Sequence, residues 1–212
     1  MVGYRDVTDP AGESVELATA HHALLAALRA SPDSDPGAPS RLAGWTIGHV
    51  LSHLARNADS HVALLAGETQ YQDGWAGRRR DVDAGATRAW PEIVADLAGS
   101  IEALDHAYSR TVDWDRPAAL LAGSQPAGFL PLARRREVEL HWVDLAFGRE
   151  LGDIPDDFVL RDLGLLQAWW TSKNRTTADA LPASLDSLDR RSRWCWLVGR
   201  LEIDGLAPAA LF

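Results

Sequence analysis

The chain of 212 residues is long enough to bury a full hydrophobic core, as one large domain or as a main domain with a small appendage. Its net charge of −9 disfavours nucleic acid or an anionic membrane as the main partner, and its single cysteine, Cys195, excludes an intramolecular disulfide. No apolar segment approaches the roughly 20 residues needed to cross a bilayer, and the N-terminus lacks an apolar signal core. We therefore expect a globular cytoplasmic protein.

Two long helices are predicted in the first third of the chain. Asp9 and Pro10 form an N-cap followed by proline at the first helical position, and the first helix runs from there to about Ala30. The second helix follows Thr46, which can cap it, carries an apolar stripe at helical spacing, and ends at Gly67.

A polar segment containing several glycines follows the second helix. Arg78, Arg79 and Arg80 lie in it and are followed at once by Asp81 and Asp83. Short charge runs of this kind mostly keep a surface hydrated. We therefore interpret the segment as a solvated loop.

Two further helices complete the N-terminal part of the chain. One opens with Pro91 in its first turn, and the other extends from about Phe129 to Phe147. Four long helices joined by loops predict a four-helix bundle over residues 1–150.

A turn-rich boundary at Gly148–Pro155 separates the bundle from the remaining residues, 151–212. One more helix is predicted over residues 156–173, and alternating polarity predicts short strands near Leu181–Leu188 and a strand or helix near Trp194–Arg200. The expected fold class is therefore mostly α, with a four-helix bundle and a small C-terminal α/β region.

The fourth helix carries charged residues between two apolar rows. At about 100° per residue, Glu137 and His141 lie one turn apart on a strip that also contains Asp144, whereas Glu139 points well away from His141. A buried carboxylate and imidazole are costly unless they are paired or bind a metal. The pair alone leaves open a metal site, a simple Glu–His hydrogen bond and a partly exposed polar strip. Asp144 could accept a hydrogen bond from a metal-binding imidazole.

The second helix offers a third candidate ligand. His49 lies nearly opposite its apolar stripe, whereas His53 lies closer to the flank and can face a neighbouring helix. His61 lies nearer the stripe and is better explained as a hydrogen-bonded core histidine. His53, Glu137 and His141 would form a His₂Glu set, which leaves a position of a zinc-type ion open, as in catalytic sites.

Two segments together resemble a known family. GWTIGHVLSHLARNAD, followed about 80 residues later by RRREVELHWVDL, resembles the mycothiol-dependent maleylpyruvate isomerase family of the DinB-like metal-dependent superfamily. The resemblance implies a four-helix bundle that binds one divalent metal, usually zinc, through His53, Glu137 and His141. Family members also carry an arginine in a C-terminal GR motif, proposed to bind an acidic substrate. The segment WLVGR makes Arg200 the matching residue here.

The resemblance implies a thiol-using enzyme. In an isomerase, a metal-bound mycothiol thiolate would add to the activated cis double bond of an acid such as maleylpyruvate, and its elimination after rotation would give the trans isomer. In a mycothiol S-transferase the thiol would stay on the electrophile, and the helix motifs do not separate these reactions. Cys195 lies between Trp194 and Trp196 and is expected to be a buried packing residue rather than a nucleophile.

A non-catalytic binding protein of the same fold is a third possibility. The chain has Trp142 where many family members have a second histidine, and its tail is shorter than is usual in the family. The leading interpretation implies mycothiol and a small acidic or electrophilic substrate as partners of a monomer or homodimer, without nucleic acid or membrane.

Overall fold

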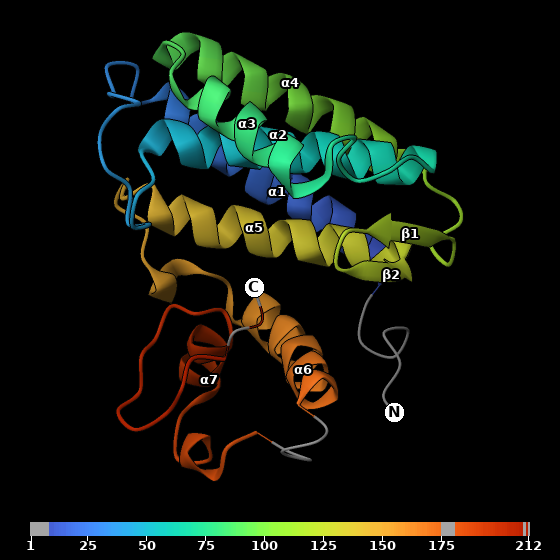
Figure 1. Ribbon diagram of the computed structural model, residues 1–212, viewed down its shortest axis with the longest axis vertical. Helices are drawn as coiled ribbons and strands as arrows, with labels where there is room; N and C mark the ends of the chain where they lie inside the picture. Colours follow the sequence, from blue (N-terminus) through green and yellow to red (C-terminus); the bar gives the residue numbers. More distant parts are fainter. Residues whose placement is uncertain (1–8, 175–180, 210, 212) are drawn as a thin grey trace. The chain divides into compact units, whose positions relative to one another are not determined.

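The computed structural model describes residues 9–174, 181–209 and 211. These residues fall into two compact units, one formed by residues 9–149 and the other by the described residues from 150 onward (Figure 1). None of the helices in the described parts of the chain is long and apolar enough to cross a membrane. The assignment of residues 1–150 and 151–212 to two separate domains stays a prediction.

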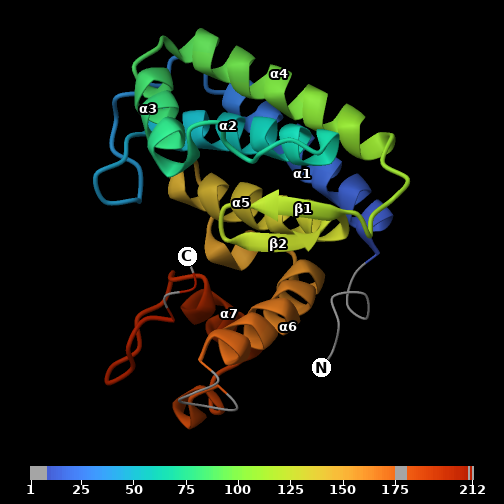
Figure 2. The same cartoon turned by 45° about the vertical axis from the view of Figure 1, so that its right-hand side comes forward.

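The N-terminal unit is built on four long helices, and the predicted four-helix bundle is confirmed. These helices are α1 (Pro10–Arg29), α2 (Ile47–Ala66), α4 (Trp90–Ser109) and α5 (Leu130–Asp144). Helices α1 and α2 each pack against both α4 and α5, as the two views show (Figure 1, Figure 2). The core between them is mostly aliphatic, and its fully buried side chains include Leu17, Leu24, Val50, Leu54, Ile93, Leu97 and Val138.

Local sequence signals set both ends of α2. The Thr46 hydroxyl accepts a hydrogen bond from the backbone N–H of His49, and the Thr46 N–H donates to the His49 ring. These reciprocal bonds form a capping box. Gly67 ends the helix in the left-handed conformation with φ of 85°, which glycine adopts without steric cost. The predicted start and end of this helix are both confirmed.

The predicted solvated loop after α2 is instead a helix, α3 (Gly74–Ala86), which packs against α2. Small residues permit a close approach of the two helices. A Cβ atom on Gly85 would lie 2.2 Å from the Ser52 hydroxyl, and one on Gly48 would lie 2.4 Å from the carbonyl oxygen of Ala86. The prediction is wrong because α3 is stabilised by this tertiary contact, whereas its own sequence lacks an apolar stripe.

A short antiparallel hairpin joins α4 to α5. Strands β1 (Pro117–Leu120) and β2 (Gly123–Pro126) pair with Pro117 opposite Pro126, and a 3₁₀ turn at Ala127–Phe129 leads into α5. The hairpin thereby sets where α5, the helix with the candidate ligands, begins.

The C-terminal unit is centred on α6 (Asp156–Lys173) and α7 (Arg190–Leu197), which pack together. Short 3₁₀ segments lie at Leu151–Asp153 and Ala183–Leu185. The predicted helix over residues 156–173 is confirmed. The predicted strands near residue 185 are wrong, because the apolar Leu185 is buried in a 3₁₀ turn rather than in a paired strand. Extended pairing among the described residues of this unit is limited to one isolated bridge near the C-terminus. The mostly α fold class is confirmed.

Candidate metal centre

The fold brings the three predicted ligands together between α2 and α5. One potential ligand atom from each of His53, Glu137 and His141 lies within 4.8 Å of the other two. Oε2 of Glu137 lies 2.8 Å from Nε2 of His53 and 3.4 Å from Nε2 of His141. The two imidazole rings are perpendicular, with their centroids 4.8 Å apart. One carboxylate oxygen is thus shared by two imidazole nitrogens.

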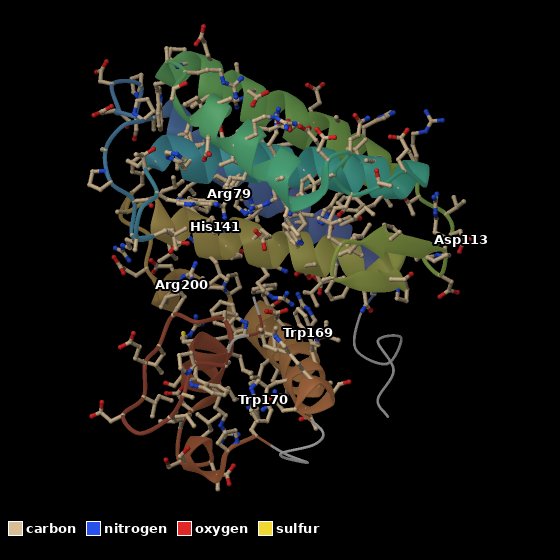
Figure 3. The ribbon with its side chains drawn as sticks, viewed as in Figure 1. Arg79, Asp113, His141, Trp169, Trp170 and Arg200 are labelled. Carbon is tan, nitrogen blue, oxygen red and sulfur yellow. The ribbon has the colours of Figure 1, made fainter. Side chains whose placement is uncertain are left out.

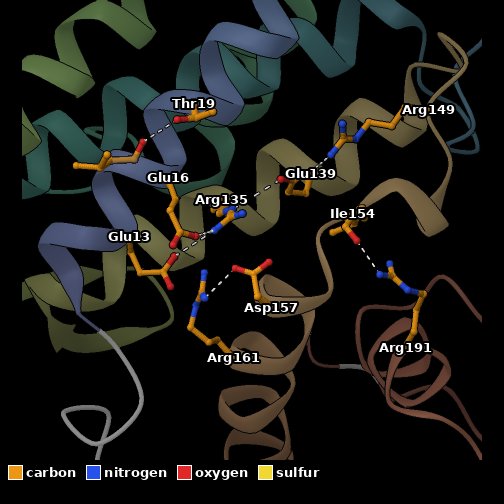
Figure 4. Close-up of polar contacts among 11 residues, drawn as sticks. Glu13, Glu16, Thr19, Arg135, Glu139, Arg149, Ile154, Asp157, Arg161 and Arg191 are labelled. Carbon is orange, nitrogen blue, oxygen red and sulfur yellow. Dashed lines mark hydrogen bonds and ion pairs between the residues drawn. The ribbon is translucent and has the colours of Figure 1, made fainter.

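Helix geometry accounts for this convergence. Glu137 and His141 are four residues apart on α5, so both side chains project from one face toward α2, which supplies His53. Figure 3 labels His141 on this helix. Glu139 projects elsewhere, as predicted. Its carboxylate pairs with Arg149 and lies 3.7 Å from Nε of Arg135 (Figure 4).

The contacts of His53 fix its protonation. Its Nε2 faces the Glu137 carboxylate, which accepts hydrogen bonds, and its Nδ1 accepts a 2.8 Å hydrogen bond from Nη2 of Arg78, which can only donate. The ring is therefore neutral with its proton on Nε2. Burial lowers the pKa of His53 from 6.5 to about 4 and outweighs the opposing effect of Glu137.

His141 stands in a different environment. Its Nδ1 lies 2.9 Å from Oδ2 of Asp144 and its Nε2 faces Glu137, so both ring nitrogens face carboxylates. Burial alone would lower the pKa of His141, but the hydrogen bonds to Asp144 and Glu137 raise it above its ordinary value. Burial likewise raises the pKa of Glu137, but hydrogen bonds from His141 and His53 outweigh it and hold this pKa well below its ordinary value.

These residues fit a divalent cation. Two imidazole nitrogens and one carboxylate are ligand types that zinc prefers, and three protein ligands leave a position open for another ligand. Asp144, which the sequence offers as a possible acceptor, accepts the Nδ1–H bond of His141 and so orients the opposite nitrogen of the ring toward Glu137. The Glu137 side chain keeps 30% of its surface exposed, so it is in contact with solvent.

Residues 17–146 match the family described as Mycothiol maleylpyruvate isomerase N-terminal domain. The chain belongs to this family. Two solved structures also share its fold, one of the mycothiol-dependent maleylpyruvate isomerase and one of a mutant of that name with a histidine replaced by alanine. They are 22% and 23% identical to this chain, with TM-scores of 0.72 and 0.77, and each alignment covers 94% of this chain and 92% of the other. No curated protein matches the chain.

Further polar residues fill the bundle one turn beyond the ligand set. Arg134 is fully buried and donates from Nε to Nε2 of His21 and from Nη1 to the side-chain oxygen of Asn57. Nδ1 of His61 lies 2.9 Å from the hydroxyl of Tyr108, so His61 is the hydrogen-bonded core histidine that its position on the stripe predicts. The interior of the bundle is therefore polar at the candidate metal centre and also around Arg134, one helical turn before Glu137.

Arg200 lies in the C-terminal unit (Figure 3). There it is half-buried and lines a cavity of about 880 Å³ together with Cys195 and residues of α6 and α7. None of the three candidate metal ligands lines this cavity. Cys195 is buried, as expected, and burial raises the pKa of its thiol. The role of Arg200 in binding substrate stays a prediction.

Sequence reasoning missed Arg78. The arginine run gave no sign that its first member touches a candidate ligand, since the segment lacks apolar periodicity. Arg78 reaches His53 because α3 packs closely on α2 at Gly48 and Gly85, and this contact is a property of the tertiary structure.

Proposed function

We propose that this chain is a metal-dependent, mycothiol-using isomerase of the maleylpyruvate isomerase type, with zinc or another divalent cation in its site. The observation that carries the proposal is the convergence of His53, Glu137 and His141 on one point, in a chain that belongs to this family. A plain structural bundle would have no need to bury two imidazoles around a half-buried carboxylate.

The bound cation would keep an external thiol in its thiolate form at neutral pH. The chain's own residues prepare that site. Glu137 supplies a permanent negative charge, because its pKa is held well below its ordinary value, and Asp144 fixes the orientation of His141. Neutral His53 would supply Nε2 as a nitrogen ligand, with its ring proton then on Nδ1.

The reaction itself takes place between thiol and substrate. Thiolate sulfur forms a bond to one carbon of the activated cis double bond, and the π electrons move onto the conjugated carbonyl group. Rotation about the resulting single bond and cleavage of the C–S bond then give the trans acid and return the thiol. Arg200 is proposed to bind a carboxylate of this acid, since a guanidinium binds carboxylates in a bidentate manner.

A mycothiol S-transferase would use the same ligands, so the product must separate the two reactions. We expect His53→Ala and Glu137→Ala to lose bound zinc and to lower mycothiol-dependent isomerisation of maleylpyruvate by more than about 100-fold. Glu139→Gln is the matched control on α5, because this carboxylate faces away from the ligand set and should leave zinc content unchanged.

Three results would contradict the proposal in different ways. Full zinc content and turnover in both alanine variants would refute the assignment of the ligands. A stable S-conjugate of mycothiol would identify a transferase instead. A wild-type chain that stays free of metal at saturating zinc would identify a non-catalytic binding protein.

A further inference from the structure

Arg78 places a positive charge next to Nδ1 of His53, the ring nitrogen that faces away from Glu137. It projects from α3, is half-buried, and its guanidinium lies 2.8 Å from Nδ1 of His53 and 5.8 Å from the centroid of the Trp75 ring. Two residues further along, Arg80 pairs with Asp73 at 2.7 Å on the exposed side of α3. The members of the arginine run therefore have different partners.

The two candidate imidazole ligands differ in the hydrogen-bond partner of Nδ1, the ring nitrogen that faces away from Glu137. A histidine that binds a metal through one nitrogen donates its other N–H to an acceptor. His141 meets this requirement, because Oδ2 of Asp144 accepts from its Nδ1. His53 does not meet it, because a guanidinium has five donors and no acceptor.

This mismatch has a definite consequence for cation binding. Nε2 of His53 faces Oε2 of Glu137, the oxygen that also lies 3.4 Å from Nε2 of His141, so it is the nitrogen available to a cation. When Nε2 binds a cation, the ring proton resides on Nδ1, and two N–H donors then face each other across 2.8 Å. The contact cannot persist in that form, and an anionic acceptor would both satisfy the released N–H groups of the guanidinium and offset its charge next to a divalent cation.

We propose that Arg78 is a substrate-positioning residue, which leaves His53 when a cation binds and then receives a carboxylate of the acidic substrate. The inference rests on the proposed function for its metal site and for the acidity of its substrate. A carboxylate is the suitable acceptor because its two oxygens match the paired N–H groups of a guanidinium. Metal binding and substrate binding would thereby be coupled through one side chain.

The first test measures zinc affinity by competition with a chromophoric chelator. Arg78→Met removes a contact that opposes cation binding, and a hydrogen bond to a charged group contributes about 1.5–3 kcal/mol, so zinc should bind roughly 10-fold to 100-fold more tightly. Arg79→Met, which replaces the exposed neighbour, should leave the affinity unchanged. Equal or weaker zinc binding by the Arg78→Met protein would overturn the inference.

The second test follows the ring proton of His53 by long-range ¹H–¹⁵N NMR. Zinc addition should move the proton from Nε2 to Nδ1 in the wild-type protein. A His53 ring that keeps its proton on Nε2 at saturating zinc would also count against the inference.

The third test measures binding of maleate, a simple cis-dicarboxylate, to the zinc-loaded protein by calorimetry. Arg78→Met should weaken maleate binding by about 10-fold to 100-fold, Arg78→Lys should restore part of it, and Arg79→Met should leave it unchanged. Equal maleate affinity in all four proteins would refute the carboxylate role. The tests distinguish failure of this inference from failure of the proposed function. A wild-type protein that binds no zinc would overturn both proposals. Normal zinc binding by the wild-type protein, with no effect of Arg78→Met, would overturn this inference alone.

Discussion

At the scale of single residues, the hydrogen-bond partner of Nδ1 sets the orientation and the proton position of each imidazole in the candidate centre. Asp144 is buried at the C-terminal end of α5 and accepts from Nδ1 of His141 at 2.9 Å. An imidazole without such a partner would be free to rotate away from Glu137. In the proposed metal site, Asp144 would therefore hold His141 in its orientation without touching the metal.

Asp144→Ala should weaken zinc binding by about 10-fold to 100-fold while His53, Glu137 and His141 remain in place. The surface variant Asp59→Ala serves as the control, since Asp59 pairs with Arg56 on the exposed side of α2. Chelator competition on both folded variants provides the measurement, and an unchanged affinity of Asp144→Ala would show that His141 is held by other contacts.

At the scale of elements, the contact between Arg78 and His53 depends on how closely α3 approaches α2. The helix α3 carries Arg78, and small residues on both sides of the contact allow its backbone to lie against α2. Gly48 is the tightest of these positions toward a backbone atom, because an added Cβ would meet the carbonyl oxygen of Ala86. A backbone atom cannot move aside as a flexible side chain can.

Gly48→Ala should destabilise the N-terminal unit by about 1–3 kcal/mol, since it forces α3 away from α2. Gly99→Ala is the opposite case on α4, where an added Cβ meets nothing within 4 Å, and it should stabilise the helix by about 0.5–1 kcal/mol. The free energy of unfolding of each variant, measured by urea unfolding, tests both expectations. A neutral or stabilising Gly48→Ala would mean that the contact between the two helices adjusts at no cost.

At the scale of the whole molecule, the buried histidines make the stability of the bundle dependent on pH. Burial lowers the pKa of His21 to about 4 and that of His61 to about 3, against 6.5 for a histidine in water. Below pH 6.5 the unfolded chain therefore takes up protons that the folded chain does not. The free energy of unfolding falls as the pH falls through 6.5 toward these folded values, and it is unaffected by these groups well above pH 6.5.

His61→Gln should reduce this acid sensitivity. Between pH 7 and pH 4.5 the variant should lose roughly 2–3 kcal/mol less stability than the wild-type chain, because one shifted proton-binding group has been removed. Thermal or urea unfolding at both pH values gives the difference. Equal losses for the two proteins would show that His61 does not carry the shift assigned to it.

The sequence by itself determined the parts of this protein that depend on local chemistry. The capping residue Thr46, the terminating Gly67 and the period of 3.6 residues fix α2 and the face from which His53 projects. The same period pairs Glu137 with His141 and directs Glu139 elsewhere. These features depend on residues within a few turns of one another, so a linear sequence contains them.

Only the tertiary structure decided the features that depend on segments far apart in the chain. Helix α3 has no apolar stripe and is stabilised by close packing on α2, which periodicity cannot reveal. Arg78, which donates a hydrogen bond to Nδ1 of His53, comes from that helix and lies 25 residues further along the chain. The apolar pattern near Leu185 resembles a strand, but it forms a 3₁₀ turn, because burial requires apolar residues and does not specify the backbone that presents them.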